Sequence, residues 1–100
     1  MTEKEKMLSG MGYNSMVDEL INDRLRAKTL CKRFNDTKPN EIKERKLILS
    51  ELFSKANDCF IEPNFFCDYG YNIEIGENFF ANHNCVILDV NKVIIGKNVM

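Results

Sequence analysis

Four side chains in the second half of the sequence could bind a small molecule that carries hydroxyl groups. Asn82 follows the apolar Ala81, so we expect its amide, which both donates and accepts hydrogen bonds, to point outward and suit a hydroxyl or an anionic intermediate. Asp68 and Asp89 stand beside positions expected to point inward, and carboxylates accept hydrogen bonds from hydroxyls. Phe80 is an outward aromatic residue that could line a pocket. The structural alternatives are a turn asparagine, solvated corner carboxylates and a ring packed on a neighbouring subunit.

His83 is the single histidine and the one side chain with the ordinary pKa of a general base near neutral pH. It stands between Asn82 and Asn84, next to an inward position. We interpret it as a surface or interface residue rather than a catalytic one. The sequence therefore assigns no catalytic residue within these 100 positions.

A six-residue repeat of apolar pairs indicates the scaffold that carries these side chains. Such a repeat fits neither a helix nor a flat strand, but it fits a coil with three flat faces, the left-handed parallel β-helix. The pairs are Cys67 and Tyr69, Ile73 and Ile75, Phe79 and Ala81, and Cys85 and Ile87, and the pairing resumes at Val93 and Ile95.

Two copies of an Ile-Gly-x-Asn-apolar unit, at residues 75–79 and 95–99, support the coil. They lie twenty residues apart, whereas three faces of six residues make eighteen, so we expect a two-residue insertion within residues 88–92. The insertion would form a loop at one corner, and loops on rigid scaffolds often carry chemistry.

The four cysteines show no Cys-x-x-Cys spacing, and the lone histidine lacks partners for zinc, so we expect free, buried thiols and no metal site. Cys67 and Cys85 are eighteen residues apart. On a coil of that length they would stack on successive turns, with Cα atoms about 5 Å apart.

The first half of the sequence predicts three helices. Thr2 and Glu5 form a capping box for a short helix that ends before Gly10. A second helix is expected over residues 17–33, where Arg24 and Lys28 interrupt the apolar stripe and should lay their stems along it with the charges in water. A third is expected from about residue 40 to 56. The apolar residues of the last two stripes are Val17, Leu20, Ile21, Ala27 and Cys31, then Ile42, Leu49, Leu52, Phe53 and Ala56.

The predicted fold class is therefore α+β, with an N-terminal helical cap over residues 1–57 and the first coils of a left-handed parallel β-helix over residues 58–100. We expect the cap to cover the strand edges of the first coil. The net charge of −1 gives no reason to expect nucleic acid or anionic membrane as a partner, and the absence of a long apolar run favours a cytoplasmic protein.

An ordered set of motifs across both halves resembles the maltose and galactoside O-acetyltransferases of the hexapeptide-repeat superfamily. In the second half these are Ile61-Glu62-Pro63, Cys67-Asp68-Tyr69-Gly70-Tyr71-Asn72-Ile73, Asn78-Phe79-Phe80-Ala81-Asn82 and Ile87-Leu88-Asp89. In the first half they are Glu5-Lys6-Met7, Tyr13, Arg24-Leu25-Arg26-Ala27-Lys28 and Phe34-Asn35.

The resemblance implies transfer of an acetyl group from acetyl-CoA to a sugar hydroxyl, in a homotrimer with active sites between subunits. It implies an acceptor site at Asn82, and we add Asp68, Phe80 and Asp89 as acceptor-binding candidates. The family's general base is a histidine that follows the second Ile-Gly-x-Asn unit and precedes a proline. That motif and most of the coenzyme A site would lie beyond Met100, so we expect this chain to be the N-terminal part of the enzyme.

Two positions depart from the pattern of some relatives, because Ser15 and Val90 stand where those relatives carry acidic residues. The identity of the acceptor sugar is therefore open. Two other functions also remain: a binding or structural coil without catalysis, and a hexapeptide acyltransferase that acts on an amine or another small acceptor.

Overall fold

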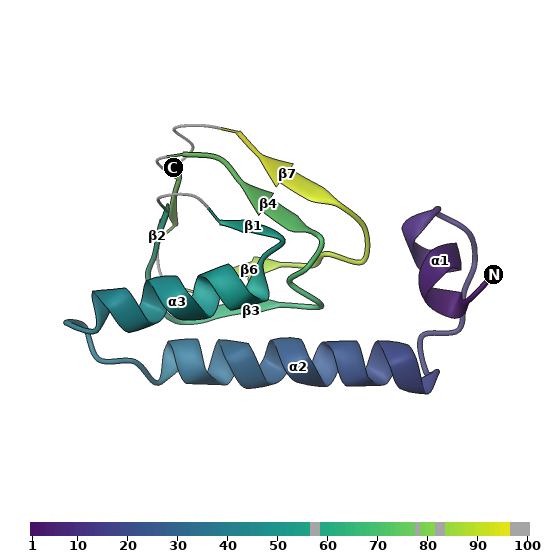
Figure 1. Cartoon of the computed structure of the whole chain (residues 1–100), viewed down its shortest axis with the longest axis horizontal. Coiled ribbons are helices and arrows are strands. Elements are labelled where there is room, and N and C mark those ends of the chain that lie inside the picture. The colour runs from purple at the N-terminus through teal and green to yellow at the C-terminus, as the bar shows by residue number, and fades with distance from the viewer. Residues whose placement is uncertain (57–58, 78, 82–83, 97–100) are drawn as a thin grey trace.

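The computed structural model describes the whole chain except residues 57–58, 78, 82–83 and 97–100 (Figure 1). The predictions that concern Asn82 and His83 therefore lie outside the described residues. Three helices come first: α1 (Glu3–Leu8), α2 (Asp18–Asn35) and α3 (Ile42–Leu52). Short strands follow: β1 (Lys55–Ala56), β2 (Cys59–Ile61), β3 (Phe65–Cys67), β4 (Ile73–Ile75), β5 (Phe79–Ala81), β6 (Cys85–Ile87) and β7 (Val93–Ile95).

Helix α1 begins at the predicted capping box. The Thr2 hydroxyl accepts from the Glu5 backbone N–H at 3.0 Å, and the Glu5 carboxylate accepts from the Thr2 N–H at 3.2 Å. These two bonds satisfy backbone donors that a helix start leaves without partners. The hydrogen bonds lower the pKa of Glu5. Gly10 then adopts a φ of +80°, which favours glycine and ends the helix as predicted.

Helix α2 confirms the second predicted helix, and its buried face is wider than the predicted stripe. Leu20, Ala27 and Cys31 are buried as expected, and Leu30 and Phe34 join them. At its last residue, the Asn35 amide accepts from the Phe65 N–H at 2.7 Å and donates to the Phe65 carbonyl at 3.1 Å. The amide thus pairs with the edge of β3 as a neighbouring strand would.

Helix α3 is shorter than predicted, because it ends at Leu52 rather than Ala56. Phe53 is extended, and the Ser54 N–H and hydroxyl both donate to the Ile73 carbonyl, at 3.1 and 2.9 Å. Ala56 pairs with Ile75 in a parallel ladder. Bonds to β4 therefore replace the helical ones that local sequence alone would favour. Ile42, predicted to face the core, is 47% exposed.

The strands form three separate parallel sheets, in the orders β1-β4-β7, β2-β5 and β3-β6. Each strand pairs with the strand three places later in the chain, so the chain winds past three faces before it returns to the same sheet (Figure 1). Cys59 pairs with Phe79, Phe65 with Cys85 and Ile73 with Val93. One turn of the winding between these partners therefore takes twenty residues.

The predicted stacking of Cys67 on Cys85 is wrong. Cys85 pairs with Phe65, and Cys67 pairs with Ile87. The predicted pair of Cys67 and Tyr69 is also displaced, because the strand of that face runs from Phe65 to Cys67. The reason is that residues 68–72 form the same five-residue corner as residues 88–92. The two extra residues belong to both turns and are not an insertion in the second.

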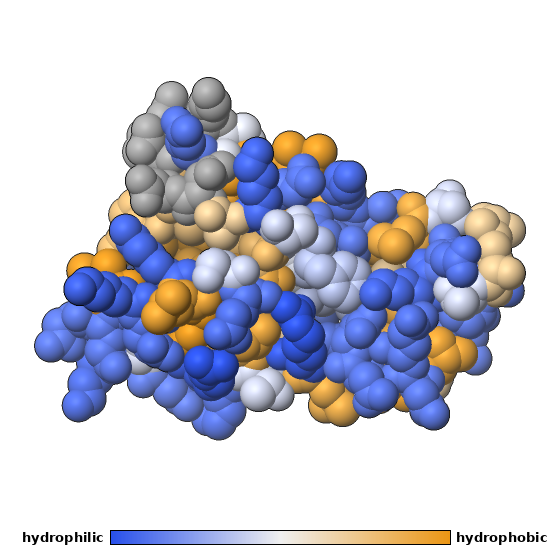
Figure 2. Space-filling view, viewed as in Figure 1, coloured by the Kyte–Doolittle hydropathy of each residue, from blue (hydrophilic) through white to orange (hydrophobic). Residues whose placement is uncertain are grey.

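The core lies between the strands and helices α2 and α3, which run along one side of the strands in Figure 1. A smaller cluster of Met7, Leu20 and Tyr69 joins α1 and α2 to the corner at residues 68–72. In the view of Figure 2, hydrophilic residues cover much of the surface, with apolar patches among them. None of the helices in the described ranges combines the length and the apolar character needed to cross a membrane.

Candidate binding corner between the helical cap and the strands

Asp89 holds together two successive turns at the corner that contains Asp68. Its side chain is fully buried, at 0% exposure. One carboxylate oxygen accepts from the Tyr69 N–H at 2.9 Å, and the other accepts from the N–H groups of Gly70 and Asn72 at 2.7 and 3.3 Å. Three backbone donors of the first turn thus share one acceptor from the second, which offsets the cost of burying a carboxylate.

Asn72 completes this link in the opposite direction. Its side-chain N–H donates to the Asp89 carbonyl at 2.7 Å, and its own carbonyl accepts from the Val93 N–H at 2.7 Å. Burial raises the pKa of Asp89, and the backbone donors oppose that shift. The corner is therefore fixed by polar contacts that only a folded second turn can supply.

Gly70 is required where this corner passes α3. Its φ is +86°, and a Cβ at this position would lie 2.6 Å from the Leu52 carbonyl oxygen and would also overlap the Leu52 side chain. Only glycine gives both the backbone conformation and the close approach. The tight contact brings the corner against the end of α3.

Helix α2 binds the same corner through Arg24. Its guanidinium donates to the Tyr69 hydroxyl at 2.9 Å and to the Ser15 carbonyl at 2.7 Å. Burial raises the pKa of Tyr69, and Arg24 opposes the rise. The prediction gave Arg24 no specific partner, whereas its planar guanidinium bonds these two oxygens at once while the residue stays half-exposed. Its place within an apolar stripe was the signal that it has a specific partner.

Tyr71 makes the second contact between cap and corner. Its hydroxyl donates to the Asp23 carboxylate at 2.9 Å, and Lys4 lies 3.3 Å from Asp23 and 4.4 Å from the Tyr71 ring centroid. Burial and the nearby Asp23 carboxylate raise the pKa of Tyr71. From the second turn, Asn91 donates to the Leu8 carbonyl at 3.0 Å. Both turns therefore contact the first half of the cap.

The structure brings together two of the four predicted acceptor-binding residues. Asp68 is half-buried in the corner that Asp89 holds. Phe80 lies on another face, 38% exposed, with its ring stacked on that of Phe60 at 5.4 Å and an interplanar angle of 8°. β5, which carries Phe80, precedes β6, whereas Asp89 follows β6. The two groups therefore lie at opposite ends of the β3-β6 sheet, and within one chain they form separate surfaces.

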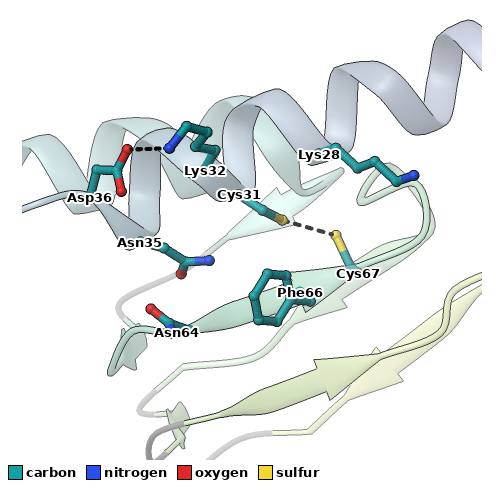
Figure 3. Close-up of a pocket in the computed structure, with 8 residues that line it drawn as sticks. All are labelled: Lys28, Cys31, Lys32, Asn35, Asp36, Asn64, Phe66 and Cys67. Atoms are coloured by element: carbon teal, nitrogen blue, oxygen red, sulfur yellow. Dashed lines mark hydrogen bonds and ion pairs between the residues drawn. The ribbon is translucent and has the colours of Figure 1, made fainter.

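A cavity of about 370 Å³ lies elsewhere, between α2 and β3 (Figure 3). Asp68, Phe80 and Asp89 do not line it. Its walls come from Lys28, Cys31, Lys32, Asn35, Asp36, Asn64, Phe66 and Cys67. The cavity is thus distinct from the predicted acceptor-binding residues that the structure describes.

The helical cap matches a family model. Residues 6–57 match the maltose acetyltransferase hexapeptide capping motif. The chain belongs to the maltose and galactoside O-acetyltransferase family. This confirms the resemblance drawn from the motifs, and the short parallel strands after the helices match hexapeptide-repeat acetyltransferase structures.

Solved structures of this acetyltransferase family superpose along nearly the whole chain. The structure of a maltose O-acetyltransferase from Clostridium difficile has a TM-score of 0.96 and 49% identity, covering 98% of this chain and 53% of that one. A galactoside acetyltransferase in complex with coenzyme A has a TM-score of 0.83 and 36% identity, covering 96% of this chain and 48% of that one. A hexapeptide-repeat acetyltransferase from Vibrio cholerae, complexed with acetyl coenzyme A, has a TM-score of 0.83, 33% identity and coverage of 96% and 52%.

Curated proteins with similar sequences include several named as acetyltransferases. A candidate acetyltransferase of Dictyostelium discoideum is 43% identical over 100% of this chain and 52% of its own length. Nodulation protein L of Rhizobium meliloti is 45% identical over 95% of this chain and 52% of its own length. The chain spans about half the length of the curated relatives it matches.

Proposed function

We propose that the protein to which these residues belong transfers an acetyl group from acetyl-CoA to a hydroxyl of a sugar such as maltose, glucose or a galactoside. The observation that carries this proposal is the match to the maltose O-acetyltransferase structure, with a TM-score of 0.96 at 49% identity. Two further similar structures hold coenzyme A or acetyl coenzyme A, which supports the donor. We place the reaction in the cytoplasm.

We propose that the winding of the strands is a left-handed parallel β-helix and that three copies assemble around it. In support, every third strand pairs in parallel, as in a coil with three faces. Outward positions on all three of these faces carry exposed apolar side chains, namely Phe60, Phe66, Phe80, Val86 and Ile94. Aromatic residues on a regular surface suit contact between subunits. An acceptor site between subunits would also explain why Asp68 and Phe80 lie at opposite ends of the β3-β6 sheet within one chain: the two residues could then come from different subunits.

In the proposed reaction the sugar hydroxyl attacks the thioester carbon, and the coenzyme A thiolate leaves. A hydroxyl is a weak nucleophile at neutral pH, so a base must take its proton, and we assign that base to a part of the enzyme outside these residues. Asn82, Asp68 and Phe80 are the residues that we propose bind the acceptor. The same role for Asp89 stays a prediction. An acceptor hydroxyl would have to compete there with the three backbone N–H groups from which the two carboxylate oxygens already accept.

The test is acetyl transfer by the purified protein, with acetyl-CoA and a panel of glucosides, galactosides and amines. We expect release of the coenzyme A thiol only with sugars. Asn82→Ala should lower turnover by roughly ten-fold to a thousand-fold with an unchanged melting temperature, because the sequence predicts an amide that points outward and contributes to binding rather than to the coil interior.

Three results would contradict the proposal. Acetylation of amines alone would point to an acyltransferase with another acceptor. Binding of sugar without transfer would favour a non-catalytic module. Near-normal turnover of Asn82→Ala would leave Asn82 as a turn residue.

A further inference from the structure

Two cysteine side chains from different parts of the chain meet between the cap and the strands. Cys31 lies in α2, and Cys67 is the last residue of β3, 36 positions later. Their sulfur atoms are 3.9 Å apart and point toward one another in Figure 3. Since each comes from a rigid element, the approach is fixed by the packing of α2 on β3.

The thiol pair lies at the wall of the cavity of about 370 Å³ between these elements. Cys31 is only 2% exposed, and Cys67 is half-buried, so a reagent must enter through the cavity. A cavity of this volume admits a molecule of a few heavy atoms. Lys28 and Lys32 also line it, from the same helix as Cys31 (Figure 3). Lys32 pairs with Asp36 at 3.0 Å, and the Asp89 carboxylate acts to raise the pKa of both thiols.

The two thiols are not equivalent. The hydrogen bond with Cys67 lowers the pKa of Cys31, because it stabilises a thiolate there. The same bond, together with burial, raises the pKa of Cys67. The pair thus holds a thiolate next to a thiol once one proton is lost, which is the combination that closes to a disulfide after oxidation; the reaction is written with the thiolate on Cys31.

We infer that Cys31 and Cys67 form a dithiol site that hydrogen peroxide, or a peroxide of similar size, converts to a disulfide. The Cys31 thiolate attacks one peroxide oxygen, the O–O bond breaks, and the product is a sulfenic acid with loss of hydroxide, which takes up a proton to become water. The Cys67 sulfur then attacks the Cys31 sulfur, the S–O bond breaks, and a second water leaves with the Cys67 proton. Two thiols are oxidised by two electrons and one peroxide is reduced to two waters.

The closure is geometrically small. The sulfur atoms must approach from 3.9 Å to about 2.0 Å. The product would join α2 to β3 covalently and lock the cap on the first turn. It would therefore limit opening of the cap, independently of whether the protein transfers acetyl groups.

The experiment treats the purified, reduced chain with one equivalent of hydrogen peroxide and then alkylates the remaining thiols. We expect a product lighter by two hydrogen atoms before alkylation, two thiols left of the four, and a peptide map that joins Cys31 to Cys67. The melting temperature of this product should rise by about 10 °C, since the cross-link restricts the unfolded chain. Dithiothreitol should reverse both changes.

Cys85→Ser is the matched control, because Cys85 is also half-buried in a strand but is paired with Phe65. It should form the same cross-link at the same rate, whereas Cys31→Ser should form none. Four alkylatable thiols after treatment, a cross-link that involves Cys59 or Cys85, or sulfinic acid without a cross-link would each overturn the inference. These outcomes are read on the parent chain itself, so a variant that fails to fold does not affect the test.

Discussion

Asp89 shows how much of this fold depends on single polar residues at one corner. Its carboxylate accepts from Tyr69, Gly70 and Asn72, all in the turn before it. The sequence correctly marks Asp89 as unusual, since it stands beside an inward position, but suggests a solvated or ligand-binding group. Its partners lie 17 to 20 residues earlier, and no local pattern reports contacts at that separation.

Replacement of Asp89 by alanine should lower the free energy of unfolding by about 3 kcal/mol, because it leaves three buried N–H groups without their acceptor. Thermal or urea unfolding measures the change. Asp68→Ala is the control within the same corner, where the side chain is half-buried, and should cost under about 1 kcal/mol. Equal effects of the two substitutions would show that the link between turns contributes little.

Gly70 gives a second test at the scale of one residue. Gly70→Ala should destabilise the protein by about 3 kcal/mol or more, because the new methyl group meets both the carbonyl and the side chain of Leu52. Gly10→Ala provides the comparison. Gly10 has a similar φ of +80°, but no atom in the described part of the chain lies within 4 Å of the added carbon, so only backbone strain of about 1 kcal/mol should appear. A melt of both variants separates overlap from strain.

At the scale of elements, the sequence predicts the helices better than the register of the strands. Capping residues and the spacing of apolar positions are local, so α1 and α2 are found close to their true ends. The strand register is not local. Tyr69 satisfies the six-residue pattern as an apolar residue, yet it packs against Met7 and Leu20 of the cap. The pattern therefore assigned it to a strand and shortened the turn from twenty residues to eighteen.

The stacking of turns gives a prediction at this scale. At Gly76 an added Cβ would lie 2.7 Å from the backbone carbon of Gly96, one turn later. Gly76→Ala should therefore push two turns apart and cost about 2 kcal/mol or more in unfolding free energy. At Gly96 an added Cβ meets no atom of the described residues within 4 Å, so Gly96→Ala in this chain should leave the melting temperature nearly unchanged. If both variants melt alike, the two turns do not stack closely at this corner.

At the scale of the whole molecule, the cap and the strands form one connected structure. Arg24, Tyr71 and Asn35 each bond across the junction, and the main core includes residues of α2, α3 and all three sheets. The sequence indicated this arrangement, because it contains two distinct periodic halves with no flexible linker between them. Which side chains meet across the junction could not be predicted, since that depends on how α2 lies on β3.

The exposed apolar residues on the sheets lead to the last prediction, which concerns assembly. Val86 is 57% exposed and pairs in register with Phe66, which is 49% exposed, so the β3-β6 face presents apolar surface.

If three copies associate through the sheets, as proposed, the purified chain should sediment at about three times its mass of 11.6 kDa. Val86→Lys should shift the mass toward that of one chain, because a charged side chain would have to be buried without a partner. Leu47→Lys is the control: Leu47 is 61% exposed, but it lies on α3 and not on the β3-β6 face, so its substitution should leave the mass unchanged. Sedimentation of the unsubstituted chain as a monomer would contradict association of the chain on its own, and an unchanged trimer with Val86→Lys would place the interface on another face.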